Sequence, residues 1–297
     1  MTFFPDPYDL ELLTALGWAT PLTTRQLHRL VAPDTNETTT QRHLQRLCRN
    51  DLVERVRLYR RTRGTTRRVA WVWLPAPKLL SVLPEDARLP PAAPPIRRAL
   101  LEHDLLRSEI LVTVLAQARG LLSGVQVIPE VRLDRTQPQP KCDAIVLLRR
   151  NPHDVPAGIP WTNLVETSVG EAVRGWAVEV DRATEGLSVI RHKAVAYKAI
   201  AENPDFYGRE WHGRMPIPLW LVPDRVRAAA ILDVWATVWP GGRWLLMTEA
   251  SLPRLVAVEY RAGETRQVTL LDGWAPGGGS VRTGHDRHNA ADGVHGR

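Results

Sequence analysis

Three acidic residues occupy positions from which a β-sheet would bring their carboxylates together. In the predicted strand Trp176–Asp181 the side chains alternate, so that Glu179 and Asp181 lie on the same side. Asp143 lies at the start of a second predicted strand, and pairing of the two strands would make all three carboxylates converge. Neighbouring carboxylates repel each other unless a cation compensates. Asp143, Glu179 and Asp181 are therefore candidate Mg²⁺ ligands and catalytic residues, since bound Mg²⁺ activates water and stabilises charge on a scissile phosphate.

A lysine could complete such a site. Three of the four lysines in the chain, Lys141, Lys193 and Lys198, fall near these acids, whereas arginine supplies nearly all the other positive charge. A lysine ammonium is a compact charge whose pKa shifts readily. Lys193 lies one turn before Tyr197 on the same face of a predicted helix.

The same acids also have a structural interpretation. Glu179 or Asp181 could pair with Arg182 or Arg191 in an ion network that serves only stability. A nuclease-like fold could also be kept solely as a platform for DNA binding or dimerisation. Clusters of interacting carboxylates are only probabilistic evidence of catalysis, so these interpretations stay open beside the catalytic one.

Hydrophobic periodicity predicts the elements that would position the acids. The expected ranges are helix Arg98–Arg119, strands Val125–Leu133, Cys142–Leu148 and Trp176–Asp181, helix Leu187–Ala201, strand Ile217–Val222, helix Asp224–Trp239, and strands Trp244–Met247, Leu255–Tyr260 and Gln267–Leu271. This order predicts an α/β or α+β domain whose sheet has mixed strand directions.

The N-terminal quarter of the chain predicts three helices and a hairpin. The expected helices are about Asp9–Ala19, a second that begins after the capping box Thr23–Gln26, and a third at about Thr38–Asn50. The expected strands are Val53–Arg60 and Arg67–Leu74. Two helices joined by a short turn and followed by a hairpin are typical of a winged helix-turn-helix.

Positive charge is concentrated in this same region. From Arg25 to Arg68 there are 12 arginines against four acids, which favours a polyanion such as double-stranded DNA as the partner. The third helix is expected to face DNA with its small polar and basic residues, and the hairpin with its arginines. The candidate DNA-binding residues are Thr39, Thr40, Arg42, His43 and Arg46 on the helix and Arg61, Arg63 and Arg67 on the hairpin. A winged helix that contacts only proteins is the alternative.

Composition sets the domain boundaries. We expect a winged helix at residues 8–74, a proline-rich linker at 75–97, the mixed-sheet domain at 98–272 and a disordered, glycine-rich tail at 273–297. No apolar run is long enough to span a membrane, and no secretory signal is evident. The two cysteines, Cys48 and Cys142, fall in different predicted domains, so we expect neither a disulfide nor a zinc site, and a cytoplasmic location.

With these features in place, the second domain resembles the PD-(D/E)XK nuclease superfamily, and the chain is more specifically similar to the replication-relaxation family of plasmid-associated proteins. The resemblance rests on short motifs: E-x-D-R-x-T-E at Glu179–Glu185, K-x-x-x-Y at Lys193 and Tyr197, and H-D-L at His103–Leu105. It implies a role in plasmid or mobile-element replication and DNA relaxation. The superfamily pattern has a lysine two residues after the glutamate, where this chain has Asp181. The resemblance therefore implies Lys193 as the substitute and as the fourth candidate catalytic residue.

Two functions are consistent with these features. In the first, the winged helix locates a DNA site while the second domain holds or nicks DNA with Mg²⁺. In the second, the protein is a non-enzymatic transcriptional regulator whose second domain forms a homodimer or senses a ligand. Both functions predict DNA binding that weakens with salt, because phosphate contacts release counterions. Only the first predicts Mg²⁺ dependence that is lost in Asp143→Ala or Glu179→Ala.

Overall fold

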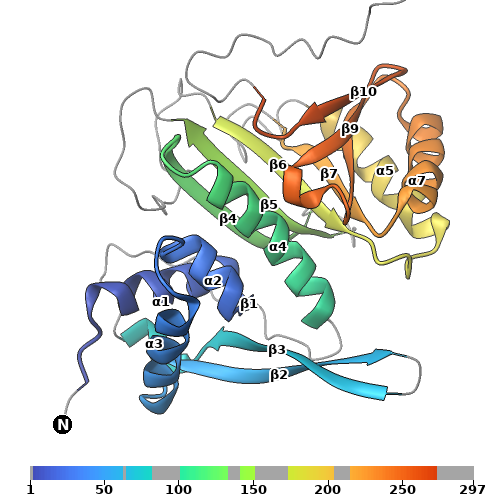
Figure 1. Ribbon diagram of the computed structural model, residues 1–297. Coiled ribbons are helices and arrows are strands. Elements are labelled where there is room, and N and C mark those ends of the chain that lie inside the picture. Colours follow the sequence, from blue (N-terminus) through green and yellow to red (C-terminus); the bar gives the residue numbers. More distant parts are fainter. Residues whose placement is uncertain are drawn as a thin grey trace, which may run out of the picture.

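The computed structural model describes residues 3–62, 65–81, 101–132, 141–150, 173–203 and 215–272. Within these residues the chain is a mixed α+β protein with a three-stranded and a seven-stranded sheet (Figure 1). The expected fold class is therefore confirmed. Most of the predicted linker and the whole predicted tail, at residues 82–100 and 273–297, lie outside the described residues.

The N-terminal unit, residues 3–81, has the predicted order of three helices and a hairpin. Its elements are α1 (Pro7–Ala19), β1 (Leu22–Thr23), α2 (Thr24–Val31), α3 (Glu37–Arg49), β2 (Val53–Thr62), β3 (Thr65–Pro75) and the 3-10 helix η1 (Pro77–Ser81). The three strands form a small antiparallel sheet in the order β1-β3-β2.

The predicted capping box at the start of α2 is present. The Gln26 backbone N–H donates to the Thr23 hydroxyl at 3.2 Å, and the Thr23 backbone N–H donates to the side-chain carbonyl oxygen of Gln26 at 2.8 Å. Asp6 and Asp9 form a second capping box at the start of α1, where no cap was predicted. These reciprocal bonds satisfy N–H groups that have no partner within a helix, and so they set where α1 and α2 begin.

The seven-stranded sheet forms the second part of the protein. Its strands are β4 (Leu122–Arg132), β5 (Lys141–Arg150), β6 (Val173–Val180), β7 (Ile217–Val222), β8 (Arg243–Thr248), β9 (Val256–Arg261) and β10 (Glu264–Thr269). They lie in the order β10-β9-β8-β7-β6-β5-β4. Strands β6, β7 and β8 are parallel and the other neighbours antiparallel, as expected for mixed directions.

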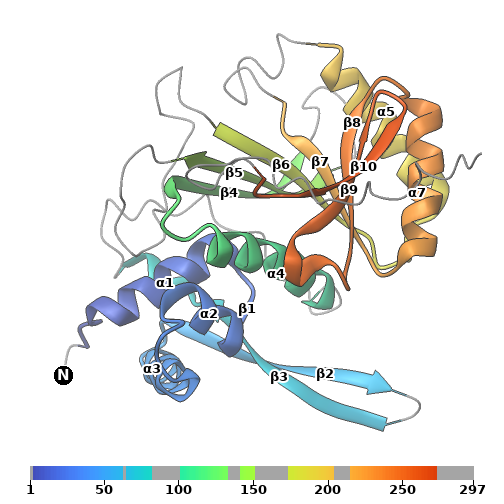
Figure 2. The ribbon, with the colours of Figure 1, turned by 45° about the horizontal axis from the view of Figure 1, so that its top comes forward.

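Helices cover both faces of this sheet. Helix α4 (Leu101–Gln117) packs on one face in a hydrophobic cluster that includes Val178 and Val180. Helices α5 (Leu187–Ala201) and α7 (Arg225–Val238) pack on the other in a cluster rich in tryptophan (Figure 2). Because side chains alternate along β6, Glu179 points to the α5 side, as the alternation of this strand predicted.

Helix α4 also joins the two parts of the protein. The hydrophobic cluster on its sheet side continues into α1 and α2, so α4 lies between the N-terminal helices and the sheet (Figures 1 and 2). Polar contacts reinforce this junction: Ser108 Oγ donates to the Ala19 carbonyl at 3.0 Å, and Arg107 donates to the Thr20 carbonyl at 2.8 Å. Among the described residues no helix is long and apolar enough to cross a membrane.

Candidate functional site

Helix α3 presents a polar face to solvent. Thr39 and Arg42 are exposed, and their side chains make no hydrogen bond or ion pair with the described residues. The opposite face buries Leu44 and Leu47 in the core. The helix therefore offers two of the five predicted α3 side chains directly to a partner.

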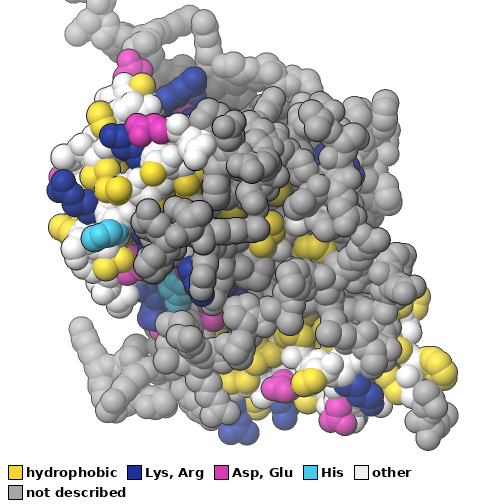
Figure 3. Space-filling model, turned by 180° about the vertical axis from the view of Figure 1, so that it is seen from behind, with side chains coloured by type: hydrophobic (Ala, Val, Ile, Leu, Met, Phe, Trp, Pro, Cys, Tyr) yellow, Lys and Arg dark blue, Asp and Glu magenta, His cyan; other side chains and the backbone are white. Residues whose placement is uncertain are grey.

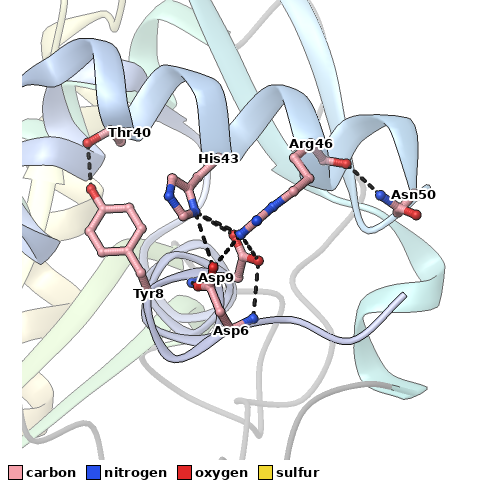
Figure 4. A network of polar contacts seen from close by, with 7 residues as sticks. All are labelled: Asp6, Tyr8, Asp9, Thr40, His43, Arg46 and Asn50. Atoms are coloured by element: carbon pink, nitrogen blue, oxygen red, sulfur yellow. Dashed lines mark hydrogen bonds and ion pairs between the residues drawn. The ribbon is translucent and has the colours of Figure 1, made fainter. Parts of the chain in front are cut away.

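The expectation that Thr40 faces outward is wrong. Its side chain is fully buried, and its hydroxyl lies 2.7 Å from the Tyr8 hydroxyl (Figure 4). The same hydroxyl lies 3.2 Å from Nδ1 of His28. Thr40 follows the exposed Thr39 by one residue, and a helix turns by about 100° per residue, which carries Thr40 onto the face that packs against α1 and α2. Thr40 therefore helps to hold α3 in place and has no direct access to DNA.

His43 and Arg46 also point toward α1 in this structure. His43 Nδ1 lies 2.9 Å from a carboxylate oxygen of the fully buried Asp9, and Arg46 bonds both Asp9 and Asp6 (Figure 4). The Arg46 side chain remains 43% exposed. These residues anchor α3 through α1, and sequence reasoning did not identify Asp6 and Asp9 as their partners.

Asp6, Asp9 and His43 form the one group of three metal-ligand side chains found among the described residues. Their ligand atoms all lie within 4.8 Å of one another. The guanidinium of Arg46 already contacts both carboxylates, so a cation of the protein itself occupies this position. The group is accordingly a helix anchor.

The hairpin β2–β3 extends beneath the N-terminal turns of α4 (Figure 1). Of the predicted hairpin residues, Arg63 lies outside the described residues, and Arg61 and Arg67 are placed only as members of β2 and β3. One face of the hairpin packs on α4 through valines and leucines, including Val56 and Val72.

The other face of the hairpin carries a group that sequence reasoning missed. The guanidinium of Arg55 lies 4.1 Å, and that of Arg57 5.0 Å, from the ring centroid of Trp71. Both arginines are exposed, and Arg55 makes no hydrogen bond or ion pair within the described part of the chain. A guanidinium stacked on a ring keeps its N–H donors at its edge, where they can reach a phosphate. In the hairpin register Arg57 lies directly opposite Trp71, and this pairing could have predicted the contact between them.

The acidic residues of the sheet each have a basic or hydrogen-bonding partner. Glu179 is fully buried; one oxygen accepts from Lys193 Nζ at 2.8 Å and the other from the Tyr197 hydroxyl at 2.8 Å. Lys193 also donates to Glu185 at 3.1 Å. The predicted approach of Lys193 to the acids is thus present, and it takes the form of an ion pair.

Asp181 and Asp143 are held by other partners. Asp181, which is 2% exposed, pairs with Arg227 of α7. Asp143 accepts a hydrogen bond from the Val180 backbone N–H at 2.7 Å, and His103 Nε2 of α4 lies 3.3 Å from the same oxygen. Each of the three acids is therefore paired, as the structural interpretation expected, but its basic partner is neither Arg182 nor Arg191.

The electrostatics follow from burial and from these contacts. Burial raises the pKa of Glu179 to about 8, although the charge of Lys193 opposes this shift. Burial alone would lower the pKa of Lys193, but the carboxylates of Glu179 and Glu185 outweigh it and raise the pKa. Lys193 therefore stays charged near neutral pH, and its charge opposes the protonation of Glu179 that burial favours.

His103 and Asp143 are a second coupled pair. Burial alone would lower the pKa of His103, but Asp104 and Asp143 outweigh it and raise the pKa to about 10. Burial would raise the pKa of Asp143, but the hydrogen bond and charge of His103 hold it below its usual value. Near neutral pH this pair is a protonated imidazole against a carboxylate.

This arrangement does not fit a bound Mg²⁺. The ligand oxygens of Asp143, Glu179 and Asp181 do not form a group within 4.8 Å of one another in the described structure. Each carboxylate contacts a basic side chain of the protein, namely His103, Lys193 and Arg227 respectively. Mg²⁺ requires near-octahedral oxygen ligands, and it would have to displace these cations.

The profile of the replication-relaxation family matches residues 13–210, which is about two thirds of the chain. The chain belongs to this family. No curated protein and no solved structure matches it significantly. Family membership supports a role in the replication of plasmids or related mobile elements at the level of the family.

Two of the motifs, H-D-L on α4 and the one that begins at Glu179, meet where α4 packs against β6. His103 lies 3.0 Å from the Val180 carbonyl at the end of β6, while Leu105 packs beside Val72 of the hairpin. Arg182, in the motif that follows β6, pairs with Glu102 of α4. The H-D-L motif therefore contacts both the acidic strand and the N-terminal unit.

Proposed function

We propose that this chain is a winged-helix protein that binds duplex DNA through the exposed face of α3 and the outer face of the β2–β3 hairpin. It would do so as part of plasmid or mobile-element replication, as its family membership suggests. The observation that carries the proposal is the anchored helix α3, whose exposed Thr39 and Arg42 have no partner among the described residues.

The surroundings of α3 support this proposal. A polar, basic helix that follows a short turn is the element that enters the major groove in helix-turn-helix proteins. The stacked pair Arg55 and Arg57 on the hairpin adds a second group of phosphate-binding donors. Helix α3 is held by buried polar contacts to α1, so its exposed side chains are preorganised for binding.

Arg42→Gln tests the proposal most simply. We expect the variant to bind a labelled duplex more weakly, and the slope of log affinity against log salt to fall by about 1, because one phosphate contact is lost. The measurement is fluorescence anisotropy over a series of salt concentrations. Arg225→Gln on α7 is the matched control, since it removes the same charge from an exposed position.

Equal binding by Arg42→Gln and wild type would exclude α3 as the interface. Absence of any salt-sensitive binding by the wild-type protein would contradict the DNA-binding proposal as a whole.

A nuclease is the second candidate function. The contact between Lys193 and Glu179 favours a nuclease. In this contact Lys193 takes the place of the lysine that the nuclease pattern has on the strand. The neutralised carboxylates weigh against it, and so we propose binding without cleavage. DNA nicking that requires both Mg²⁺ and Glu179 would be the signature of the nuclease.

A further inference from the structure

Two arginines gather around one buried glutamate on the seven-stranded sheet. Arg243 of β8 and Arg266 of β10 both bond Glu259 of β9 through Nε, each at 2.6 Å. Glu259 is 1% exposed, whereas the Arg243 and Arg266 side chains are 48% and 65% exposed. A buried carboxylate thus holds two guanidiniums at the surface. We call Arg243, Glu259 and Arg266 the arginine clamp.

The register of the sheet explains this geometry. Glu259 lies directly opposite Arg266 on one side and Leu245 on the other, so these side chains share one face. Leu245 and Ala257 belong to the hydrophobic cluster that includes α4. The arginine clamp therefore lies on the face of the sheet that α4 and the N-terminal unit also occupy.

The clamp leaves donors available for a ligand. Both arginines use Nε to bind Glu259, and their terminal nitrogens make no hydrogen bond or ion pair with the described residues. A guanidinium recognises phosphate through parallel N–H groups at its edge. Since Nε and its bond to Glu259 fix the plane of each group, the terminal nitrogens are preorganised.

The positive charge of the clamp is also only partly neutralised. Glu259 can neutralise only one of its two arginines. Arg174 of β6 adds a further positive charge nearby, which Asp272 partly offsets. Burial and the neighbouring charge of Arg243 lower the pKa of Arg174. Like charges held together are costly unless an anion compensates, and a phosphate would supply that anion.

We propose that the arginine clamp binds a phosphate group, and that the phosphate comes from the backbone of the duplex held by the N-terminal unit. The DNA source rests on the proposed function, whereas the phosphate chemistry rests on the clamp alone. A free phosphate or nucleotide is the other source of the same chemistry, and the two are separated by experiment.

The test is the triple variant Arg243→Gln/Glu259→Gln/Arg266→Gln. It removes the acid together with the arginines, so that no buried carboxylate is left without a partner. Its net charge changes by the same amount as that of Arg191→Gln, an exposed arginine of α5 on the opposite face of the sheet. In the view from behind, the described side chains that are visible include basic, acidic and hydrophobic ones (Figure 3). Arg191→Gln is therefore the matched control.

The first measurement is binding to a labelled duplex of about three helical turns across a salt series. The second is the shift in thermal unfolding midpoint on adding inorganic phosphate or pyrophosphate. We expect the triple variant to lower the salt slope by about 1 to 2 relative to the control, because up to two phosphate contacts are lost. The single variant Arg266→Gln, which leaves Glu259 paired with Arg243, should lower the slope by a smaller amount and serves if the triple variant folds poorly.

The outcomes separate cleanly. A reduced slope assigns the phosphate to DNA, while a lost phosphate-induced shift with an unchanged slope assigns it to a free phosphate. If the triple variant matches Arg191→Gln in both measurements, the clamp has no ligand role and the inference is overturned. If the wild-type protein binds no duplex, the proposed function fails, and the phosphate arm still decides the clamp.

Discussion

Lys193 neutralises a carboxylate that is shut off from water. Removing one partner of a buried ion pair leaves the other charge uncompensated, which costs about 3 to 5 kcal/mol. Glu179 can escape part of this cost by protonation, because burial raises its pKa to about 8. We therefore expect Lys193→Met to lower the free energy of unfolding by about 3 kcal/mol in urea near neutral pH.

Lys198 on the same helix provides the control. Its side chain is 41% exposed and its ammonium lies 3.9 Å from Glu202, so Lys198→Met should change stability by less than about 0.5 kcal/mol. The double variant Glu179→Gln/Lys193→Met should be more stable than Lys193→Met alone. Equal effects of the two lysine substitutions would contradict a structural role for Lys193.

The charge on His103 predicts a pH dependence. Its pKa is raised to about 10 in the folded protein, against about 6.5 in an unfolded chain, so the folded state binds a proton more tightly. The resulting stabilisation is complete below about pH 6.5 and is lost as the pH rises toward about 10. Unfolding in urea should show wild type losing more stability than His103→Gln across this range.

His192→Gln checks that the effect belongs to the buried site, because His192 is exposed on α5. It should follow the wild-type pH profile. Parallel profiles for wild type and His103→Gln would instead show that the pair of His103 and Asp143 contributes no pH-dependent stability.

Among the elements, α3 depends on α1 for its position. Asp9 is fully buried and accepts contacts from His43 and Arg46, so Asp9→Ala leaves these groups without their main acceptor. We expect a loss of about 1 to 3 kcal/mol in unfolding free energy. We also expect weaker DNA binding, because the exposed face of α3 is no longer held in one orientation.

Two further variants distinguish a residue that positions α3 from a residue that contacts DNA. Arg42→Gln should weaken DNA binding while changing stability by less than about 0.5 kcal/mol, since Arg42 has no partner among the described residues. Glu11→Ala, an exposed change on α1, should alter neither property. Full DNA affinity in a destabilised Asp9→Ala protein would show that the anchor does not position α3.

Helix α4 links the acidic strand to the N-terminal unit. His103 of α4 contacts the end of β6. Glu109 of α4 accepts a hydrogen bond at 2.8 Å from the side chain of Gln26 in α2. Ser108 and Arg107 bond the turn between α1 and β1. The H-D-L motif on α4 therefore lies where the two parts of the protein pack together.

For the molecule as a whole, the order of the elements could be predicted because it depends on local signals. Helix Leu187–Ala201 and strand Ile217–Val222 have the predicted bounds, since periodicity and flanking polar residues define both. The approach of Lys193 to Glu179 was also predictable, because one strand and the next helix fix it.

The remaining features depend on contacts between distant segments. Thr40 was misplaced because its burial depends on Tyr8 of another helix, which the pattern of α3 alone does not reveal. Asp181 pairs with Arg227, 46 residues away, and the arginine clamp arises from sheet register. The sequence showed which charges are present, but only the fold shows which of them compensate one another.

One gel tests the central claim that this protein binds DNA through α3 while its acidic motif serves the fold. Supercoiled plasmid is incubated with wild type, Arg42→Gln or Glu179→Gln, with and without Mg²⁺, at a temperature at which all three proteins are folded. We predict a mobility shift without nicking for wild type and Glu179→Gln, and a weakened shift for Arg42→Gln. Nicked or linear plasmid that requires both Mg²⁺ and Glu179 would contradict the account and establish a nuclease.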